Sequence, residues 1–242
     1  MSRASGLRVA GLLLAPLLLV QASRVRRRTP RLPEASGPRM GSSGTGAPIR
    51  VLILGDSAAA GVGVAKQDQA LSGRLAAELE GSFRVDWTLQ AQTGLAVRDL
   101  VLRLEAAAAQ TFDCAVVSVG VNDVTGGTAN RSWCAGLTQL VGLLATKFGA
   151  RAVLLTAVPP MHRFSALPQP LRWYLGARAR ELDGLLAEFA LRSNGCERIA
   201  PTLPQAGGFL AADGFHPGAP AYACWARSAA AAIRTRFSGS AS

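Results

Sequence analysis

In the stretch VLILGDSAAAG, residues 51–61, an uninterrupted run of apolar residues and Gly55 leads directly into Asp56 and Ser57, which small residues follow. A strand that is apolar at every position, rather than at alternate ones, is typical of a parallel sheet covered by helices on both faces. The run ends near Gly55, and Ser57 follows with only small residues around it. In parallel α/β sheets, ligands bind beyond the carboxyl ends of the strands. The stretch therefore predicts a parallel sheet with an accessible serine hydroxyl at its binding edge.

The rest of the chain repeats this alternation of strands and helices. Short apolar runs bounded by Gly, Asp or Pro predict strands at 50–54, 84–90, 113–119 and 151–157, with a weaker one at 197–200. Helical spacing of apolar residues predicts helices at 68–80, 95–109, 132–148, 170–192 and 217–236. This order predicts an α/β fold with three layers, α/β/α, around a flavodoxin-like, doubly wound parallel sheet of about five strands.

The formal net charge of +11 is concentrated at the N-terminus. Residues 1–50 hold nine arginines against one acid, whereas residues 51–242 hold 17 basic and 14 acidic side chains. A nearly neutral domain with scattered arginines lacks the basic stripe of a nucleic-acid-binding protein. We expect no nucleic-acid partner.

The first 28 residues form an apolar segment with a basic flank. The apolar run 9–22 is short for a membrane span, and four of the five residues at 24–28 are arginines. One interpretation is a signal peptide, exported and cleaved near Ala22. The other is an uncleaved segment that associates with a membrane through residues 9–22 while its arginines bind anionic lipid. Arginines directly after an apolar run oppose export, which favours membrane association, with the side of the membrane left open.

Residues 29–48 are rich in Pro, Gly and Ser and have no apolar period, which predicts a linker before a domain at 49–238. The four cysteines are far apart in sequence and form no C-x-x-C pair. We therefore expect no zinc site. Whether any cysteines are paired stays open at this point.

Ser57 taken alone is equally consistent with an ordinary helix cap, because serine is a weak nucleophile without a base. The chain has only two histidines, His162 and His216. His216 lies in ADGFHPG, residues 212–218, three positions after Asp213. A carboxylate, an imidazole and a hydroxyl are the groups of a catalytic triad. The structural alternative is a loop histidine beside a turn-forming aspartate.

Two further candidates follow strands of the same predicted sheet. Asn122 follows the strand at 113–119, and its amide could donate to an oxyanion, although an Asn-Asp turn is the plain alternative. Gly94 follows the second strand, where a glycine lets a backbone N–H approach a ligand or simply permits a left-handed turn. All of these candidates lie at the carboxyl edge of one sheet.

These segments resemble the four sequence blocks of the SGNH hydrolases, also called GDSL-type esterases, in order, spacing and position. The blocks here are Gly55-Asp56-Ser57, Gly94, Gly120-Val121-Asn122-Asp123 and Asp213-Gly214-Phe215-His216. The resemblance, to a bacterial carboxylesterase or lysophospholipase type of member, covers nearly all of 50–236. One departure is Ala58, where the family has leucine, which affects packing near the serine and removes no catalytic group.

The resemblance implies that Ser57 is the nucleophile, that His216 is the general base and then the acid, and that Asp213 orients the imidazole. It also implies an oxyanion hole made by the backbone N–H groups of Ser57 and Gly94 and the side-chain amide of Asn122. Asp56 and Asp123 would hold their loops in shape. No metal or cofactor is implied.

The substrate is less defined by the sequence. The segment 158–176 is long and rich in aromatics and proline, and it offers five candidate substrate-binding residues, Met161, His162, Phe164, Leu167 and Trp173. They could equally anchor the next helix to the core. We predict a serine esterase acting on small carboxylic esters with short acyl or aryl groups. The alternatives are an O-acetyl-sugar deacetylase, a lysophospholipase, or a catalytically silent membrane-associated binding module, and the oligomeric state stays open.

Overall fold

The computed structural model describes residues 3–202 and 208–237, which contain one six-stranded sheet. The strands are β1 (Met40–Ser43), β2 (Ala47–Gly55), β3 (Phe83–Ala91), β4 (Cys114–Ser118), β5 (Ala152–Thr156) and β6 (Cys196–Ile199). Their spatial order is β1-β3-β2-β4-β5-β6, and β1 alone is antiparallel to its neighbour. The predicted doubly wound α/β fold is confirmed, with six strands in place of about five.

The helices follow the predicted alternation. They are α1 (Arg3–Arg28), α2 (Leu71–Leu79), α3 (Val97–Ala106), α4 (Val121–Gly126), α5 (Asn130–Thr146), α6 (Leu171–Arg192) and α7 (Ala219–Phe237), with short 3-10 turns η1 (Gln67–Gln69) and η2 (Met161–Arg163). Helix α4 was not predicted because a helix of six residues is too short to show a helical period.

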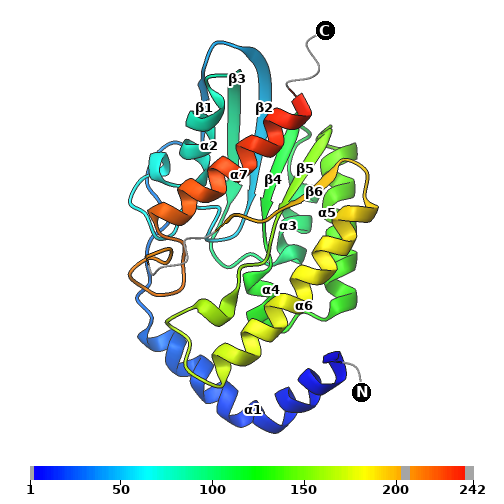
Figure 1. The fold of residues 1–242 in the computed structure, drawn as a ribbon. Helices are drawn as coiled ribbons and strands as arrows, with labels where there is room; N and C mark the ends of the chain where they lie inside the picture. The colour runs from blue at the N-terminus through cyan, green and yellow to red at the C-terminus, as the bar shows by residue number, and fades with distance from the viewer. Residues whose placement is uncertain (1–2, 203–207, 238–242) are drawn as a thin grey trace.

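Strand β2 explains why the apolar run in the sequence has no interruption. Leu52 and Leu54 pack into the core beside α3, α5 and α6, while Val51 and Ile53 pack into the core beside α2 and α7. Figure 1 shows α2 and α7 over one face of the sheet and α3 and α5 on the other. Because successive strand residues point to opposite faces, a strand buried on both faces must be apolar throughout.

The chain order places a crevice at the centre of the sheet. Strand β2 lies between β3 and β4, so the chain leaves β2 toward one side and returns to β4 on the other. Loops that diverge in this way open a binding site at the carboxyl ends of the two strands. The loop with Ser57 follows β2, and α4 with Asn122 follows β4.

Residues 29–48 correct the expectation of a linker. Strand β1 pairs with β3, and Ala35 is buried. Ser36 and Lys66 pair through their backbones as an isolated parallel β-bridge. The sequence gives no apolar signal here because this segment attaches mainly through backbone hydrogen bonds, which glycine and serine form as well as any residue. The segment is part of the folded domain.

Helix α1 contains both the apolar run 9–22 and its basic flank. Within residues 3–202 and 208–237, α1 is the helix that is long and apolar enough to cross a membrane, over Val9–Arg28 with a mean hydropathy of 1.4. An N-terminal signal sequence has the same properties, so signal and anchor both stay predictions. In the structure α1 lies against α6 (Figure 1).

Candidate active site

Three side chains from opposite ends of the chain meet beyond the carboxyl end of β2. The hydroxyl oxygen of Ser57 lies 3.0 Å from Nε2 of His216, and Nδ1 of His216 lies 2.5 Å from Oδ2 of Asp213. Ser57 and His216 are 159 positions apart in sequence. A hydroxyl held against an imidazole that is itself held by a carboxylate can transfer its proton to the imidazole during attack on a carbonyl carbon.

Ser57 does not begin a helix. The chain after β2 forms successive turns, in which Ala60 N–H donates to Asp56 O and Val62 N–H donates to Ser57 O, both at 3.0 Å. Helix α2 begins only at Leu71. The turns are supported from α7 by the hydroxyl of Tyr222, which lies 2.9 Å from Ala58 O and 2.8 Å from Val62 O. A turn rather than a helix cap therefore presents the serine.

The carboxylate of Asp213 is set up to stay ionised beside the imidazole. Burial by itself would raise the pKa of Asp213, but hydrogen bonds from the His216 ring and from two backbone N–H groups outweigh it and lower the pKa. Those N–H groups, of Phe215 and His216, each lie 3.0 Å from Oδ1. The Asp213 side chain is fully buried, whereas the His216 side chain is 19% exposed toward the site. This arrangement favours a positively charged imidazole during proton transfer.

Gly94 and Asn122 meet at the neighbouring part of the crevice. The Asn122 amide donates one hydrogen bond to Leu95 O at 2.9 Å, which ties it to the loop that carries Gly94. An amide nitrogen has two N–H groups, so the second can still donate to a ligand. Gly94 has a φ of +92°, a conformation that other residues rarely adopt, and its backbone is exposed. The hydrogen bond therefore joins the loop after β3, which carries Gly94, to helix α4, which follows β4.

A pocket of about 360 Å³ opens on Ser57 and His216. Its walls are mostly apolar and come from the ends of β4 and β5, from the loop before His216 and from α7. They include Val119, Val158, Phe164, Phe209, Phe215 and Trp225. The lining also includes the ion pair of Asp183 and Arg198, whose charged atoms lie 2.6 Å apart. The pocket suits a small, largely apolar group.

The five candidate substrate-binding residues do not share this pocket, which corrects the expectation of a single wall. Phe164 lines the pocket, and Leu167 lines a separate groove beside α1. Met161 is fully buried in the core, while His162 and Trp173 are exposed on the outside of the segment. The sequence could not show which of the five residues lie in the core, in a cavity or on the surface. The chain is helical in η2 and at the start of α6, so neighbouring residues there point in different directions.

Among residues 3–202 and 208–237, no group of three or more His, Cys, Asp or Glu side chains gathers as a metal site would require.

Residues 53–224 match the GDSL-like Lipase/Acylhydrolase family, which is more than half of the chain. The chain belongs to this family. A GDSL-like esterase of Mycobacterium tuberculosis, Rv1075c, is 29% identical over an alignment of 188 residues that covers 72% of this chain and 58% of that protein's length. This GDSL-like chain therefore spans little more than half of that relative.

Solved structures of family members have the same fold. A member of the lipolytic protein G-D-S-L family from Veillonella parvula superposes with a TM-score of 0.62 at 20% identity, covering 79% of this chain and 100% of the other. The esterase EstA from a Pseudoalteromonas species superposes with a TM-score of 0.60 at 17% identity, covering 78% and 98%. At these identities the likeness shows the fold alone.

Two buried aspartates of the GDSL-like domain hold the site loops. Asp56 Oδ1 accepts hydrogen bonds from Ala58 N–H at 3.1 Å and from the Ser118 hydroxyl at 3.4 Å. Burial raises the pKa of Asp56 to about 7, although these hydrogen bonds act in the opposite direction. Asp123 accepts from Val97 N–H at 3.1 Å, and burial likewise raises its pKa. Neither carboxylate reaches His216, so both act on loop shape.

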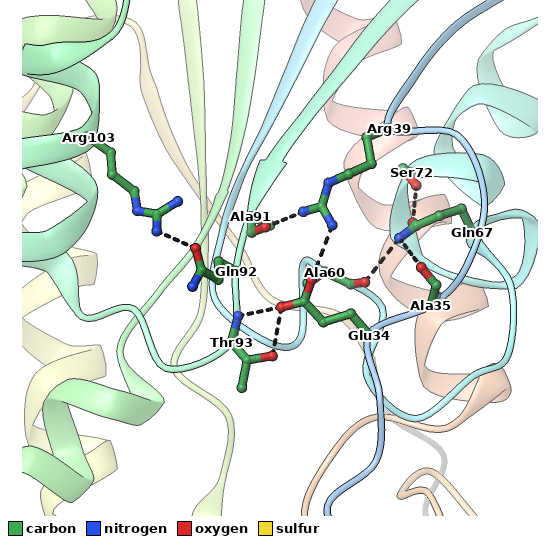
Figure 2. A network of polar contacts seen from close by, with 10 residues as sticks. All are labelled: Glu34, Ala35, Arg39, Ala60, Gln67, Ser72, Ala91, Gln92, Thr93 and Arg103. Carbon is green, nitrogen blue, oxygen red and sulfur yellow. Dashed lines mark hydrogen bonds and ion pairs between the residues drawn. The ribbon is translucent and has the colours of Figure 1, made fainter.

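A segment at residues 34–39, called the strap below and not indicated by the motifs of the sequence, contacts both Thr93 in the loop after β3 and Gln67 (Figure 2). Oε1 of Glu34 accepts hydrogen bonds from the backbone N–H and the hydroxyl of Thr93, at 2.7 and 2.8 Å. Arg39 pairs with the other Glu34 oxygen at 3.2 Å and also donates to Ala91 O. Thr93 directly precedes Gly94, so Glu34 fixes the loop that presents the Gly94 N–H.

The same strap also reaches the serine turn. The Gln67 amide donates to Ala35 O at 3.1 Å and to Ala60 O at 3.0 Å, and it accepts from Ser72 at 2.7 Å (Figure 2). The strap thus connects the turn after β2 with the loop after β3. One signal was available in the sequence, since Glu34 is the single acid among the first 50 residues.

Proposed function

We propose that the protein is a serine esterase that hydrolyses carboxylic esters through an acyl-enzyme intermediate, with Ser57 as nucleophile. One observation carries the proposal: a chain of two hydrogen bonds joins the three side chains. Ser57 Oγ lies 3.0 Å from His216 Nε2, and His216 Nδ1 lies 2.5 Å from Asp213 Oδ2. Membership in a family of carboxylic ester hydrolases supports it.

The first half of the reaction transfers the acyl group to the enzyme. Ser57 Oγ forms a bond to the ester carbonyl carbon while its proton moves to His216 Nε2. The carbonyl oxygen becomes an oxyanion that receives N–H donors from Gly94, Asn122 and Ser57 itself. The bond from the carbonyl carbon to the alcohol oxygen then breaks, and the alcohol takes the proton from His216.

The second half returns the free enzyme. Water loses a proton to His216 Nε2 as its oxygen attacks the acyl carbon, and the bond to Ser57 Oγ breaks as that oxygen regains the proton. Asp213 stays ionised throughout and stabilises the charged imidazole. The volume of the pocket, about 360 Å³, and its apolar walls support small esters with short acyl or aryl groups as substrates.

A covalent probe tests the nucleophile directly. The full chain in detergent is treated with a fluorophosphonate, which phosphonylates activated serines, and its intact mass is measured. We expect one adduct on the wild type and on Ser132→Ala, because Ser132 is an exposed residue of α5 that does not line the pocket. We expect none on Ser57→Ala or His216→Ala.

Turnover of p-nitrophenyl acetate by the same variants completes the test. Ser57→Ala should lower kcat/KM by at least about a thousandfold while the melting temperature stays near that of the wild type. Full activity in His216→Ala would rule out the proposed base. A folded wild type that takes no label and hydrolyses no ester would instead favour a silent binding module.

A further inference from the structure

Helix α1 has two apolar faces, and only one of them packs against the protein. Leu18 is buried in the core, and Leu14, Ala22 and Val25 pack against the same core at spacings of three or four residues. The other side of the helix leaves large side chains 45% to 78% exposed, namely Val9, Leu12, Leu13, Leu17, Leu19 and Val20. One apolar side of α1 is therefore buried against the domain. The other apolar side would be more stable in contact with an apolar medium than with water.

The docked side is fixed by polar contacts as well as by packing. The Gln21 amide donates to Gln169 O at 2.7 Å, and its oxygen accepts from Leu171 N–H at 3.1 Å, at the start of α6. Gly11 lets α1 come close to α6, because a Cβ at this position would lie 2.9 Å from the Tyr174 ring. A helix held to the domain along its length lies beside the domain rather than projecting away from it through a bilayer.

Four arginines extend this arrangement at the end of α1. Arg24, Arg26, Arg27 and Arg28 are all exposed. Each basic side chain near an anionic lipid surface adds attraction. The exposed apolar side of α1 followed by these arginines matches a helix that lies in the interface of an anionic membrane.

Between α1 and the domain runs a groove of about 1080 Å³. Its walls include Leu18, Leu19 and Ala22 from α1, Leu171 and Leu175 from α6, and Thr125 from α4. Its lining also includes Gly94 and Asn122, the two residues proposed to donate to the carbonyl oxygen. Phe215 separates it from the pocket that holds Ser57 and His216, since its ring lines both.

The chemistry of the site assigns the two cavities to the two halves of an ester. The leaving alcohol must lie beside His216 Nε2 to receive its proton, and His216 lines the pocket. The carbonyl oxygen must lie beside Gly94 and Asn122, which line the groove. A long acyl chain attached to that carbonyl carbon can therefore leave along the groove, toward α1.

We propose that the groove between α1, α4 and α6 binds the fatty acyl chain of an ester that enters from the membrane on which α1 lies. The inference rests on the proposed function, and it extends that function from small esters to lipid esters. The groove volume of about 1080 Å³ slightly exceeds the usual range for ligand sites, about 300 to 1,000 Å³, and leaves room for a long acyl chain.

Substitutions on the two walls test the groove. The measured quantity is the ratio of kcat/KM for p-nitrophenyl dodecanoate to that for p-nitrophenyl acetate, using the full chain and both esters in detergent micelles. Thr125→Trp fills the groove from α4 and should lower the ratio about tenfold or more, because methylene contacts are lost. Thr138→Trp is the matched control, since Thr138 makes the same hydrogen bond to the carbonyl four residues earlier but lies on α5 outside the groove. It should leave the ratio unchanged.

A second pair separates the groove from the membrane. Leu19→Glu and Leu13→Glu add the same charge to the same exposed helix, but only Leu19 lines the groove. With dodecanoate dissolved in vesicles of anionic phospholipid, both variants should lose activity. With dodecanoate delivered by cyclodextrin in the absence of vesicles, Leu19→Glu alone should lose it.

The outcomes are distinguishable from failure of the esterase itself. Acetate hydrolysis that depends on Ser57, together with an unchanged ratio in Thr125→Trp, would overturn the groove and leave the esterase intact. If Leu19→Glu and Leu13→Glu lose equal activity on the dodecanoate delivered by cyclodextrin, the proposal that α1 forms one wall of the acyl groove is overturned. Unchanged vesicle activity in Leu13→Glu would overturn entry from the membrane.

Discussion

Asn122 serves both the protein and its proposed reaction, because one amide N–H donates to Leu95 O and the other is available to an oxyanion. We expect Asn122→Ala to lower kcat by about 10² to 10³, with a much smaller change in KM, since the donor acts mainly on the transition state. Steady-state kinetics with p-nitrophenyl acetate measure this. The melting temperature shows whether loss of the bond to Leu95 disturbs the loop, and unchanged kcat would exclude Asn122 from the oxyanion hole.

Glu34 acts at a distance from the reacting atoms through Thr93. Hydrogen bonds from Thr93 and the nearby Arg39 outweigh burial and lower the pKa of Glu34, so it is ionised at neutral pH. Glu34→Gln weakens two charge-assisted hydrogen bonds, and we expect kcat to fall about tenfold while KM changes little. Glu188→Gln removes the same charge from an exposed ion pair and should match the wild type. Equal kcat values in the two variants would contradict a positioning role.

Asp56 gives stability an unusual dependence on pH. An acid whose pKa is higher in the folded protein than in the unfolded chain binds its proton more tightly when folded. The free energy of unfolding should therefore fall as the pH rises from 3.8, the ordinary pKa, to about 7. The loss is on the order of 4 kcal/mol for a shift of about three pKa units.

Asp56→Asn tests this dependence, because the amide carries no charge at any pH. Denaturant unfolding between pH 4 and 7 should give a flatter curve for Asp56→Asn than for the wild type. Asp68→Asn, at an exposed position, should follow the wild-type curve. Parallel curves for all three proteins would show that Asp56 is ionised across this range at no cost to the fold.

The residues at the site differ in how far the sequence could predict them. Ser57, Asp213 and His216 were accessible because each lies in a short segment whose neighbours and spacing carry information. The partners of Glu34 and Tyr222 were not, because each lies far along the chain, at separations of 59 and 164 residues, and the isolated acid at position 34 does not say which residue it contacts. A contact of that kind depends on the assembled fold and leaves no local pattern.

At the scale of elements, α7 supports the serine turn from behind. The fully buried Tyr222 reaches two carbonyl oxygens of that turn, which would lose this donor in Tyr222→Phe. We expect the free energy of unfolding to fall by about 1 to 3 kcal/mol and kcat to fall with it. Tyr174→Phe, at the other tyrosine, on α6, is the control. A stable variant with wild-type kcat would show that the turn holds itself.

The elements themselves were largely predictable, since buried strands and long helices have strong periods. The missed elements are short or lack a pattern, as with the six residues of α4 and the Gly- and Ser-containing β1. Strand β1 is specified by the edge of β3 that it pairs with, which the local sequence does not encode.

For the molecule as a whole, residues 3–46 contact the domain at several places. Helix α1 docks on α6, the strap at 34–39 connects two site loops, and β1 completes the sheet. Composition suggested that this part was separable, because its arginines, prolines and glycines resemble those of linkers and leaders. Contacts along its length make it part of the same structure as the candidate site.

Strand β1 has a further consequence for how the protein behaves in concentrated solution. By pairing with Val85–Thr88 of β3, it covers that part of a nine-residue strand and leaves a strand of only four residues as the edge of the sheet. A long free edge pairs with the same edge of another molecule and leads to aggregation. We expect a chain begun at Ala47 to self-associate in light scattering, whereas the full chain in the same detergent stays dispersed. The N-terminal segment would then protect the enzyme from its own copies.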